Sequence, residues 1–337
     1  MIIVLKPGIG KKDEAAVLKE IRRLGYQPHV MRGVARTVIG AIGDERTHKS
    51  LETLASWAQV ESVMPIQKRY KLVSREAHGR ASTIDVRGNV IGGKRVQVMA
   101  GPCSVESELQ LMTTAHAVKK AGATILRGGA FKPRTSPYEF QGLGEKGLKL
   151  LAKARQETGL AIITELLSEQ QAELVADYAD ILQIGTRNAH NFQLLIAAAR
   201  TGKPVLLKRG LSMKIEEWLL AGEYILANEN PNLMFCERGV RTFETFTRNM
   251  LDLSTIPIIK KESHCPIVID PSQGSGRADL VASMCKGAVA MGADALLIEV
   301  HPNPAEAWSD GAQQVSLEGF ATLMEELKPF IAAAGRE

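Results

Sequence analysis

Side chains that can ionise stand at, or just beyond, the ends of short apolar runs in the second part of the sequence. In chain order they are Cys103, Arg127, Glu165, Arg187, Lys208, Glu237 with Arg238, Asp270 and Glu299. Only 23% of the chain is charged, so an ionisable residue at the end of every run exceeds what chance placement supplies. If the runs are strands of a barrel, these side chains converge on one mouth, where such barrels carry out their chemistry.

Basic side chains dominate this predicted mouth. They are Arg127, Lys132, Arg134, Arg187, Lys208 and Arg238. An arginine offers a planar fork to a carboxylate or phosphate, and a lysine offers a point charge. Cations gathered around one small cavity repel each other unless an anion fills it, so we expect a small, multiply anionic ligand such as a phosphate ester. The concave site and an aromatic content of only 5% disfavour duplex nucleic acid as a partner.

Sulfur and oxygen donors near the first and last runs suggest a second function. Cys103, Glu299 and Asp310 lie beyond strands that become neighbours when a barrel closes. A thiolate with two carboxylates suits a divalent metal such as Mn²⁺, Fe²⁺ or Zn²⁺. Spacing alone leaves the alternative that these residues are only structural.

Eight apolar runs, each followed by a helix-like stretch, are the elements that must position these side chains. They are Val96–Ala100, Thr124–Leu126, Ala161–Thr164, Ile181–Ile184, Val205–Leu207, Leu233–Phe235, Ile267–Ile269 and Ala295–Ile298. Continuous rather than alternating apolar runs indicate parallel strands buried on both faces. The pattern predicts an α/β chain dominated by a (β/α)8 TIM barrel. A doubly wound sheet is the alternative, but no Gly-x-Gly-x-x-Gly motif follows an early strand.

The first 70 residues predict a separate small α+β domain. Helix-like stretches at 11–24 and 45–57 lie among four strand-like segments, in the βαββαβ order of a ferredoxin-like fold. Residues 71–94 are polar and rich in glycine, which predicts a linker with a short hairpin closing the barrel floor. We therefore expect a ferredoxin-like domain at 1–70, the linker at 71–94 and a catalytic barrel at 95–337.

Composition excludes several other classes of protein. Apolar residues make up 45% of the 337 residues, which is ordinary for a globular protein and unlike a disordered chain. No run approaches 18 uncharged apolar residues, and the N-terminus lacks a signal-peptide pattern, so we expect no membrane partner. Four cysteines without a Cys-x-x-Cys pair indicate reduced thiols and a cytoplasmic protein. The net charge of +5 comes from the first 76 residues, which carry 14 Lys/Arg against 8 Asp/Glu.

Local motifs after the strands carry a family resemblance. The motifs are Gly101–Ser104, Leu126–Pro137, Ile184–Asn188, Leu207–Gly210, Cys236–Gly239, Glu299–Pro302 and Ser309–Gly311. Together they closely resemble 3-deoxy-D-arabino-heptulosonate 7-phosphate (DAHP) synthases of the type I beta-like group, which carry an N-terminal ferredoxin-like regulatory domain. The resemblance covers nearly the whole chain. The Lys132–Thr135 run, KPRT, separates it from the sister enzyme that makes 3-deoxy-octulosonate 8-phosphate.

The resemblance implies condensation of phosphoenolpyruvate with erythrose 4-phosphate, the first step of the shikimate pathway. By motif match, the residues implied to hold phosphoenolpyruvate are Arg127, Lys132, Arg187, Lys208 and Arg238. Arg134 and Thr135 are implied to hold erythrose 4-phosphate, with Ser136 nearby. Lys132 is also a candidate general acid at the aldehyde oxygen.

The family's metal site uses a Cys, a His, a Glu and an Asp, and this sequence departs from it at one position. The Asp270-Pro271-Ser272 run continues with Gln273 where the family has its histidine. One interpretation is that Cys103, Glu299 and Asp310 still bind Mn, Fe, Zn or Co, with Gln273 or water as fourth ligand. Two alternatives are weak metal binding with slow turnover, and a weakened homologue that acts as a ligand-sensing protein.

The N-terminal domain resembles a feedback module that binds tyrosine or phenylalanine between paired subunits. His29 and the strand at residues 36–40 match that module. The alternative is a packing domain without a ligand. The resemblance further implies a homotetramer.

Overall fold

The chain divides into two units, Met1–Arg69 and Tyr70–Glu337. In the part of the chain that the structure describes, the smaller unit has one buried apolar cluster, and the larger unit has two. The computed structural model describes all residues except 34–35, 44–49 and 65–67. Each of the two units is described below by itself.

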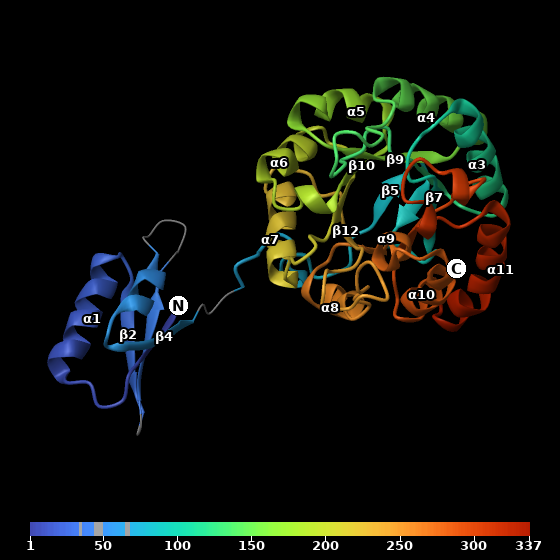
Figure 1. The fold of residues 1–337 in the computed structure, drawn as a ribbon. Coiled ribbons are helices and arrows are strands. Elements are labelled where there is room, and N and C mark those ends of the chain that lie inside the picture. Colours follow the sequence, from blue (N-terminus) through green and yellow to red (C-terminus); the bar gives the residue numbers. More distant parts are fainter. Residues whose placement is uncertain (34–35, 44–49, 65–67) are drawn as a thin grey trace. The chain divides into compact units, whose positions relative to one another are not determined.

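The smaller unit is a four-stranded antiparallel sheet with one long helix (Figure 1). Its elements are β1 (Ile2–Leu5), α1 (Lys11–Arg23), β2 (Gln27–Arg32), β3 (Thr37–Ile42) and β4 (Val60–Met64). The sheet order β2-β3-β1-β4 is that of a ferredoxin-like fold, as predicted. Val17 and Ile21 lie four residues apart on α1, so both reach the core of this unit.

The helix expected at 45–57 differs from the prediction. Residues 44–49 lie outside the described part of the chain, and the remainder forms a 3₁₀ helix, Leu51–Ser56. Leu51 and Leu54 are its buried residues, spaced three apart as a 3₁₀ turn requires.

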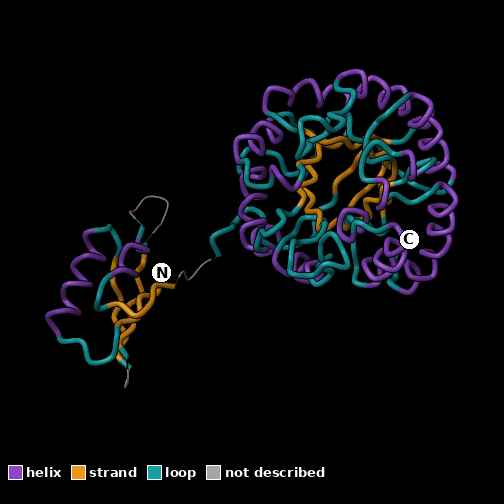
Figure 2. The backbone as a smooth tube through the Cα atoms, in the orientation of Figure 1, coloured by secondary structure: helices purple, strands orange, loops and turns teal. Residues whose placement is uncertain are grey.

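The larger unit is a closed barrel of eight parallel strands, which confirms the predicted TIM barrel (Figure 2). The strands are β7 (Gln97–Gly101), β8 (Ile125–Arg127), β9 (Ala161–Leu166), β10 (Ile181–Ile184), β11 (Val205–Lys208), β12 (Leu233–Glu237), β13 (Ile267–Ile269) and β14 (Ala295–Glu299). Nearly every strand residue is buried, because helices cover one face and the barrel interior covers the other. The barrel closes where β14 pairs with β7, so the ends of the first and last strands are neighbours.

Helices surround the strands as an outer ring (Figure 1). They are α3 (Glu108–Lys120), α4 (Glu145–Thr158), α5 (Ala172–Tyr178), α6 (Phe192–Arg200), α7 (Ile215–Leu226), α8 (Thr255–Glu262), α10 (Ala278–Ala290) and α11 (Leu317–Ala333). A short helix, α9 (Pro271–Ser275), follows β13 directly, with Asp270 as its N-cap and a proline in its first turn. This short helix places Gln273 in the wall of the mouth.

A hairpin closes the opposite end of the barrel. After the short helix α2 (Arg75–His78), the strands β5 (Ile84–Val86) and β6 (Asn89–Ile91) pair with each other. Ile84, Val86 and Ile91 join the apolar cluster of the barrel interior. The side chain of Gln97, at the start of β7, donates to the carbonyl of Val90 at 3.1 Å, which fixes the hairpin at the N-terminal ends of the strands.

Among the described residues, no helix is both long enough and apolar enough to cross a bilayer.

Candidate active site

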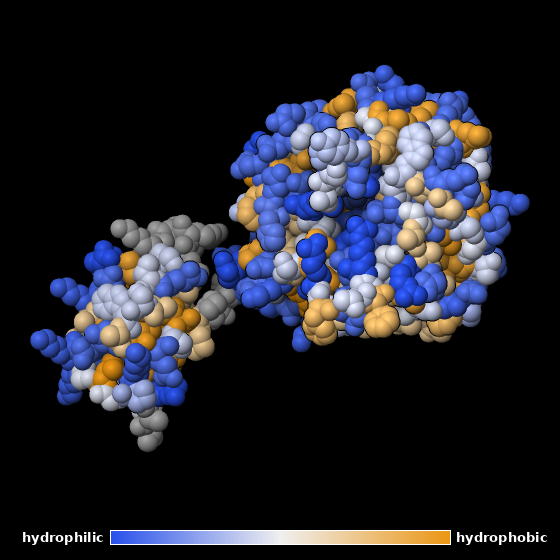
Figure 3. All heavy atoms as spheres, in the orientation of Figure 1, coloured by the Kyte–Doolittle hydropathy of each residue, from blue (hydrophilic) through white to orange (hydrophobic). Residues whose placement is uncertain are grey.

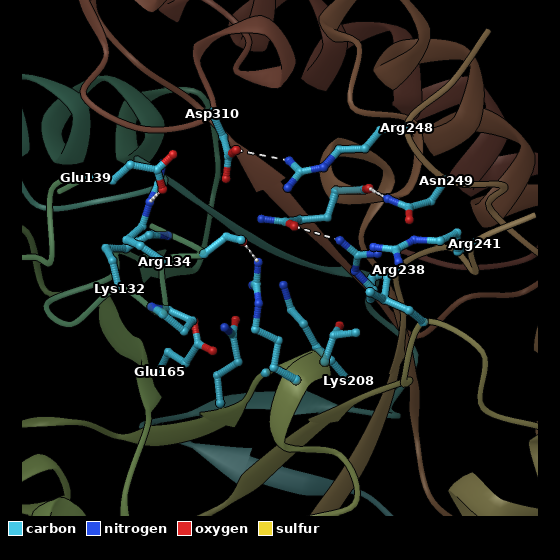
Figure 4. Close-up of a pocket in the computed structure, with 18 of the residues that line it drawn as sticks. Lys132, Arg134, Glu139, Glu165, Lys208, Arg238, Arg241, Arg248, Asn249 and Asp310 are labelled. Atoms are coloured by element: carbon cyan, nitrogen blue, oxygen red, sulfur yellow. Dashed lines mark hydrogen bonds and ion pairs between the residues drawn. The ribbon is translucent and has the colours of Figure 1, made fainter. Parts of the chain in front are cut away.

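A cavity of about 310 Å³ opens at the C-terminal ends of the barrel strands. Figure 3 shows the hollow with hydrophilic side chains around it, and Figure 4 shows the lining residues. Seven residues predicted to bind substrates line it: Arg127, Lys132, Arg134, Thr135, Arg187, Lys208 and Arg238. Ser136 is not among the lining residues; its hydroxyl accepts from the backbone N–H of Tyr138 at 3.3 Å.

The deepest cations of this mouth are paired with buried carboxylates. Arg127 donates to Glu299 at 2.9 Å, and Lys208 donates to Asp270 at 2.6 Å. All four side chains are at most 5% exposed. An unpaired charge at such depth is costly, and each carboxylate offsets the charge of its cation. Asp270 is therefore a partner of Lys208 rather than an isolated group of the mouth.

Cys103, Glu299 and Asp310 come together beside these cations. Their donor atoms all lie within 4.8 Å of one another, and Cys103 and Glu299 are buried. The Cys103 thiol donates to Asp310 at 3.4 Å, and Lys132 Nζ lies 3.1 Å from the Cys103 sulfur. Burial, reinforced by the charge of Glu299, raises the pKa of Cys103 to about 11. One soft and two hard donors at this separation fit a divalent metal ion.

Two groups that the sequence pattern did not reveal, Gln313 and Arg248, hold the two carboxylates of the cluster in place. Gln313 donates to Glu299 at 2.7 Å and accepts from Arg248 at 3.2 Å. Arg248 also donates to Asp310 at 3.0 Å, as Figure 4 shows. Neutral glutamine and a loop arginine far from any apolar run gave no signal in the sequence pattern. Such groups around metal ligands fix their orientation and tune their affinity.

The amide of Gln273 lies between the cluster and the cations. Its oxygen accepts from Arg238 at 2.8 Å, and its nitrogen donates to Glu299 at 3.2 Å. The backbone N–H of Gln273 donates to the N-cap Asp270 at 2.9 Å. That Gln273 serves as a fourth metal ligand stays a prediction.

A buried ion pair shapes the turn that presents Arg238. Arg209 donates to the fully buried Glu237 at 2.9 Å, and Glu237 also accepts from the backbone N–H of Gly239 at 2.6 Å. Gly239 has a φ of 87°, and a Cβ there would lie 2.8 Å from the Asn249 side chain. The turn therefore needs glycine, and it aims Arg238 into the cavity (Figure 4).

This ion pair yields a stability prediction. We expect Arg209→Ala to lower the free energy of unfolding by about 3–5 kcal/mol, because Glu237 is left buried without its cation. Urea denaturation followed by circular dichroism measures the change. Arg277→Ala breaks an exposed pair with Asp279 and serves as the control, with an expected loss below about 1 kcal/mol. Equal losses in the two variants would contradict the prediction.

The loop after β8 that carries the KPRT run is tied to its surroundings. Arg134 donates to Glu139 at 2.8 Å, and Arg187 lies 3.4 Å from the hydroxyl of Thr135. Phe140 packs edge-on against Trp308, with 4.9 Å between ring centroids, close in sequence to Asp310. The loop that bears Arg134 thus contacts the loop that bears one of the three donors.

Histidines take no direct part in the cluster among the described residues. His301 pairs with Glu106 at 3.1 Å, and His264 lies between the Ser82 hydroxyl at 2.8 Å and the Leu72 carbonyl at 2.9 Å. His29 is exposed on the edge strand β2, and nothing in the structure tests its predicted regulatory role.

Comparison with known proteins agrees with this geometry. The DAHP synthetase I family matches residues 75–333, and the DAHP synthase ferredoxin-like domain matches residues 1–68. Phospho-2-dehydro-3-deoxyheptonate aldolase of Thermotoga maritima is 50% identical over 335 residues, covering 99% of each chain. The crystal structure of a Thermotoga maritima DAHP synthase superposes with a TM-score of 0.96 at 49% identity, covering 100% of this chain and 98% of that chain.

Proteins named for a sister activity are also similar to this chain, at lower sequence identity. A 2-dehydro-3-deoxyphosphooctonate aldolase of Caulobacter vibrioides is 32% identical over 255 residues, covering 70% of this chain and 87% of that protein. Neither this alternative nor the ligand-sensing alternative is favoured, because the match to the heptonate aldolase is stronger and extends through both units. The chain belongs to the DAHP synthetase I family and carries that family's ferredoxin-like domain at its N-terminus.

Proposed function

We propose that the barrel mouth condenses phosphoenolpyruvate with erythrose 4-phosphate to give DAHP and inorganic phosphate, the first step of the shikimate pathway. The chain is a DAHP synthase by its full-length similarity to the Thermotoga enzyme. The observation that carries the proposal is one cavity with cations on its walls and the Cys103–Glu299–Asp310 cluster at its edge. Two phosphorylated substrates need such cations, because their own charges repel each other.

Phosphoenolpyruvate is assigned to the cations at the strand ends: Arg127, Lys132, Arg187, Lys208 and Arg238. Arg127 and Arg238 each have a buried Nε atom without a hydrogen-bond partner. Buried donors of this kind are costly unless a ligand uses them, and a carboxylate or phosphate supplies the missing acceptor. Arg134 and Thr135 are assigned to the phosphate of erythrose 4-phosphate, with Ser136 shaping the loop beside them.

Lys132 is the group we assign to proton transfer. Its ammonium lies 3.1 Å from the Cys103 sulfur and 3.1 Å from the Cys103 carbonyl, so it reaches the cluster from the cavity side. Lys132 gives a proton to the aldehyde oxygen as C3 of phosphoenolpyruvate forms the new carbon–carbon bond. Water then adds at C2, and the bond from C2 to the phosphate oxygen breaks with release of inorganic phosphate.

Divalent metals are used in the DAHP synthase family, and we assign the metal here to Cys103, Glu299 and Asp310. A bound metal supplies Lewis-acid polarisation of the aldehyde. Mn, Fe, Zn and Co all remain candidates, because one sulfur and two oxygen donors accept each of them.

Metal affinity is expected to depend on pH through Cys103. Its raised pKa of about 11 keeps the thiol protonated at neutral pH, and ligation releases that proton. Affinity should therefore fall about tenfold for each unit by which the pH is lowered from 8.5 to 6.5. Titration of the metal-free protein with Co²⁺ at several pH values measures the slope. An affinity that does not change with pH would contradict ligation by the thiolate.

The N-terminal unit is proposed to bind tyrosine or phenylalanine and to regulate the barrel, with His29 as a contact in a homotetramer acting in the cytoplasm. The match to a DAHP synthase ferredoxin-like domain supports a regulatory role. Millimolar tyrosine or phenylalanine should change both the activity and the melting temperature of the full chain. If neither amino acid changed the activity or the melting temperature, the proposed regulatory role would be wrong.

Phosphate release from phosphoenolpyruvate, with erythrose 4-phosphate as acceptor, tests the proposed reaction. Turnover should stop with chelator and return with a divalent metal, and arabinose 5-phosphate should be a much poorer acceptor. Preference for arabinose 5-phosphate would refute the assignment of the substrate.

A further inference from the structure

The side-chain amide of Gln273 links two parts of the mouth with different tasks. We infer that Gln273 is a positioning residue that orients Arg238 for phosphoenolpyruvate and does not ligate the metal. The inference rests on the proposed function, because that function assigns Arg238 to this substrate. The metal then has three protein ligands, Cys103, Glu299 and Asp310, and its fourth coordination position is open.

The orientation of the amide follows from its two partners. Arg238 Nη2 donates to the amide oxygen at 2.8 Å, and the amide nitrogen donates to Glu299 Oε1 at 3.2 Å. A guanidinium can only donate hydrogen bonds, and a carboxylate can only accept them. Turning the amide over would place donor against donor and acceptor against acceptor, so the observed orientation is the one the partners permit.

This orientation aims the wrong atom at the three donors for ligation. A glutamine binds a metal through its carbonyl oxygen, and here that oxygen accepts from Arg238 while the nitrogen is the atom next to Glu299. The nitrogen that faces Glu299 carries two protons and has no free lone pair to offer. Three protein ligands with one open position are the arrangement of catalytic rather than structural metal sites.

The backbone of Gln273 is fixed on both sides of the residue. Its N–H donates to Asp270 at 2.9 Å, and Asp270 also holds Lys208. Its carbonyl accepts from Asn249 at 3.0 Å. The amide therefore extends from a rigid base, which gives it the means to hold a long arginine side chain in one place.

The consequence for binding is specific to one substrate. Arg238 is nine-tenths or more buried, and its Nε atom lacks a partner. Its guanidinium is held by two contacts, a 3.3 Å hydrogen bond to the carbonyl of the adjacent Gly239 and the shorter 2.8 Å bond to Gln273, which is the one to another side chain. Removing the amide leaves only the bond to Gly239, so the guanidinium can take further rotamers and the substrate must then order it. A loss of about tenfold in phosphoenolpyruvate affinity corresponds to one ordered charged side chain.

The experiment compares Gln273→Leu, Arg238→Met and the double variant, each as the full chain loaded with Co²⁺. Metal content and the cobalt absorption spectrum report ligation, and phosphoenolpyruvate titration reports binding; neither readout requires turnover. Gln273→Leu should keep one cobalt per chain and the native spectrum, while its dissociation constant for phosphoenolpyruvate rises about tenfold. Cys103→Ser serves as the control that must lose the sulfur-to-cobalt absorption band.

A double-mutant cycle decides whether Gln273 acts through Arg238. In the Arg238→Met background, Gln273→Leu should add no further loss of phosphoenolpyruvate affinity. A changed cobalt spectrum in Gln273→Leu, or losses that add in the double variant, would overturn the inference. Failure of the native protein to consume phosphoenolpyruvate with erythrose 4-phosphate would instead refute the proposed function, and leaves the cobalt result to be read separately.

Discussion

Lys132→Met should lower kcat of the DAHP synthase reaction by about a thousandfold, the range expected when a general acid is removed. Lys132 is 8% exposed, and its ammonium contacts both the carbonyl and the sulfur of Cys103. At this buried position, we expect no other group to replace it as the proton donor. Methionine nearly preserves the length of the side chain and removes its charge and its protons. Steady-state kinetics with both substrates, followed by phosphate release, measures the effect.

The same substitution at an exposed lysine provides the control. Lys149 lies on α4 and pairs with Glu145 at the surface, so Lys149→Met should leave kcat within about twofold of native. Melting curves of both variants show whether folding is intact. If Lys132→Met turned over at near-native rate with intact folding, another group would have to supply the proton.

Cys103→Ala should lose bound metal and at least about a thousandfold in kcat, because one of only three donors in the cluster disappears. The thiol is fully buried, donates to Asp310 and accepts from Lys132. We therefore expect no surface residue to replace it as a ligand. Elemental analysis after dialysis against metal measures the content of each variant, and phosphate release measures the rate.

Cys285→Ala is the matched control for this loss. Cys285 is equally buried but lies on α10, in the apolar core outside the barrel strands. Its removal should cost about 1 kcal/mol of stability and leave metal content and kcat unchanged. Equal metal content in the Cys103 and Cys285 variants would contradict the assignment of the cluster.

The barrel was predictable from sequence because each strand is a continuous apolar run. Ile181–Ile184 and Ile267–Ile269 are predicted with the bounds that β10 and β13 have in the structure. The same runs located the mouth, since parallel strands carry their C-terminal ends to one side. Cys103, Glu299 and Asp310 could be grouped for the same reason, because closure makes β7 and β14 neighbours.

The groups that hold those donors could not be predicted in this way. Gln313 and Arg248 belong to loops after β14 and β12, whose paths depend on contacts made across the mouth. Asp310 adopts a left-handed φ of 48°, which is uncommon for a residue other than glycine and has no sequence signature. The 3₁₀ turn at Leu51–Ser56 was predicted as a longer helix because a single apolar face fits either geometry over so few residues.

The β5–β6 hairpin determines the route by which substrates enter and products leave. Ile84, Val86 and Ile91 fill the barrel interior from the end opposite the cavity. Both substrates must therefore arrive through the mouth, and the sugar phosphate and inorganic phosphate must depart by the same route. If the cations of the mouth bind the phosphorylated substrates as proposed, departing phosphate passes those same cations, and accumulated phosphate should compete with the next substrate for them.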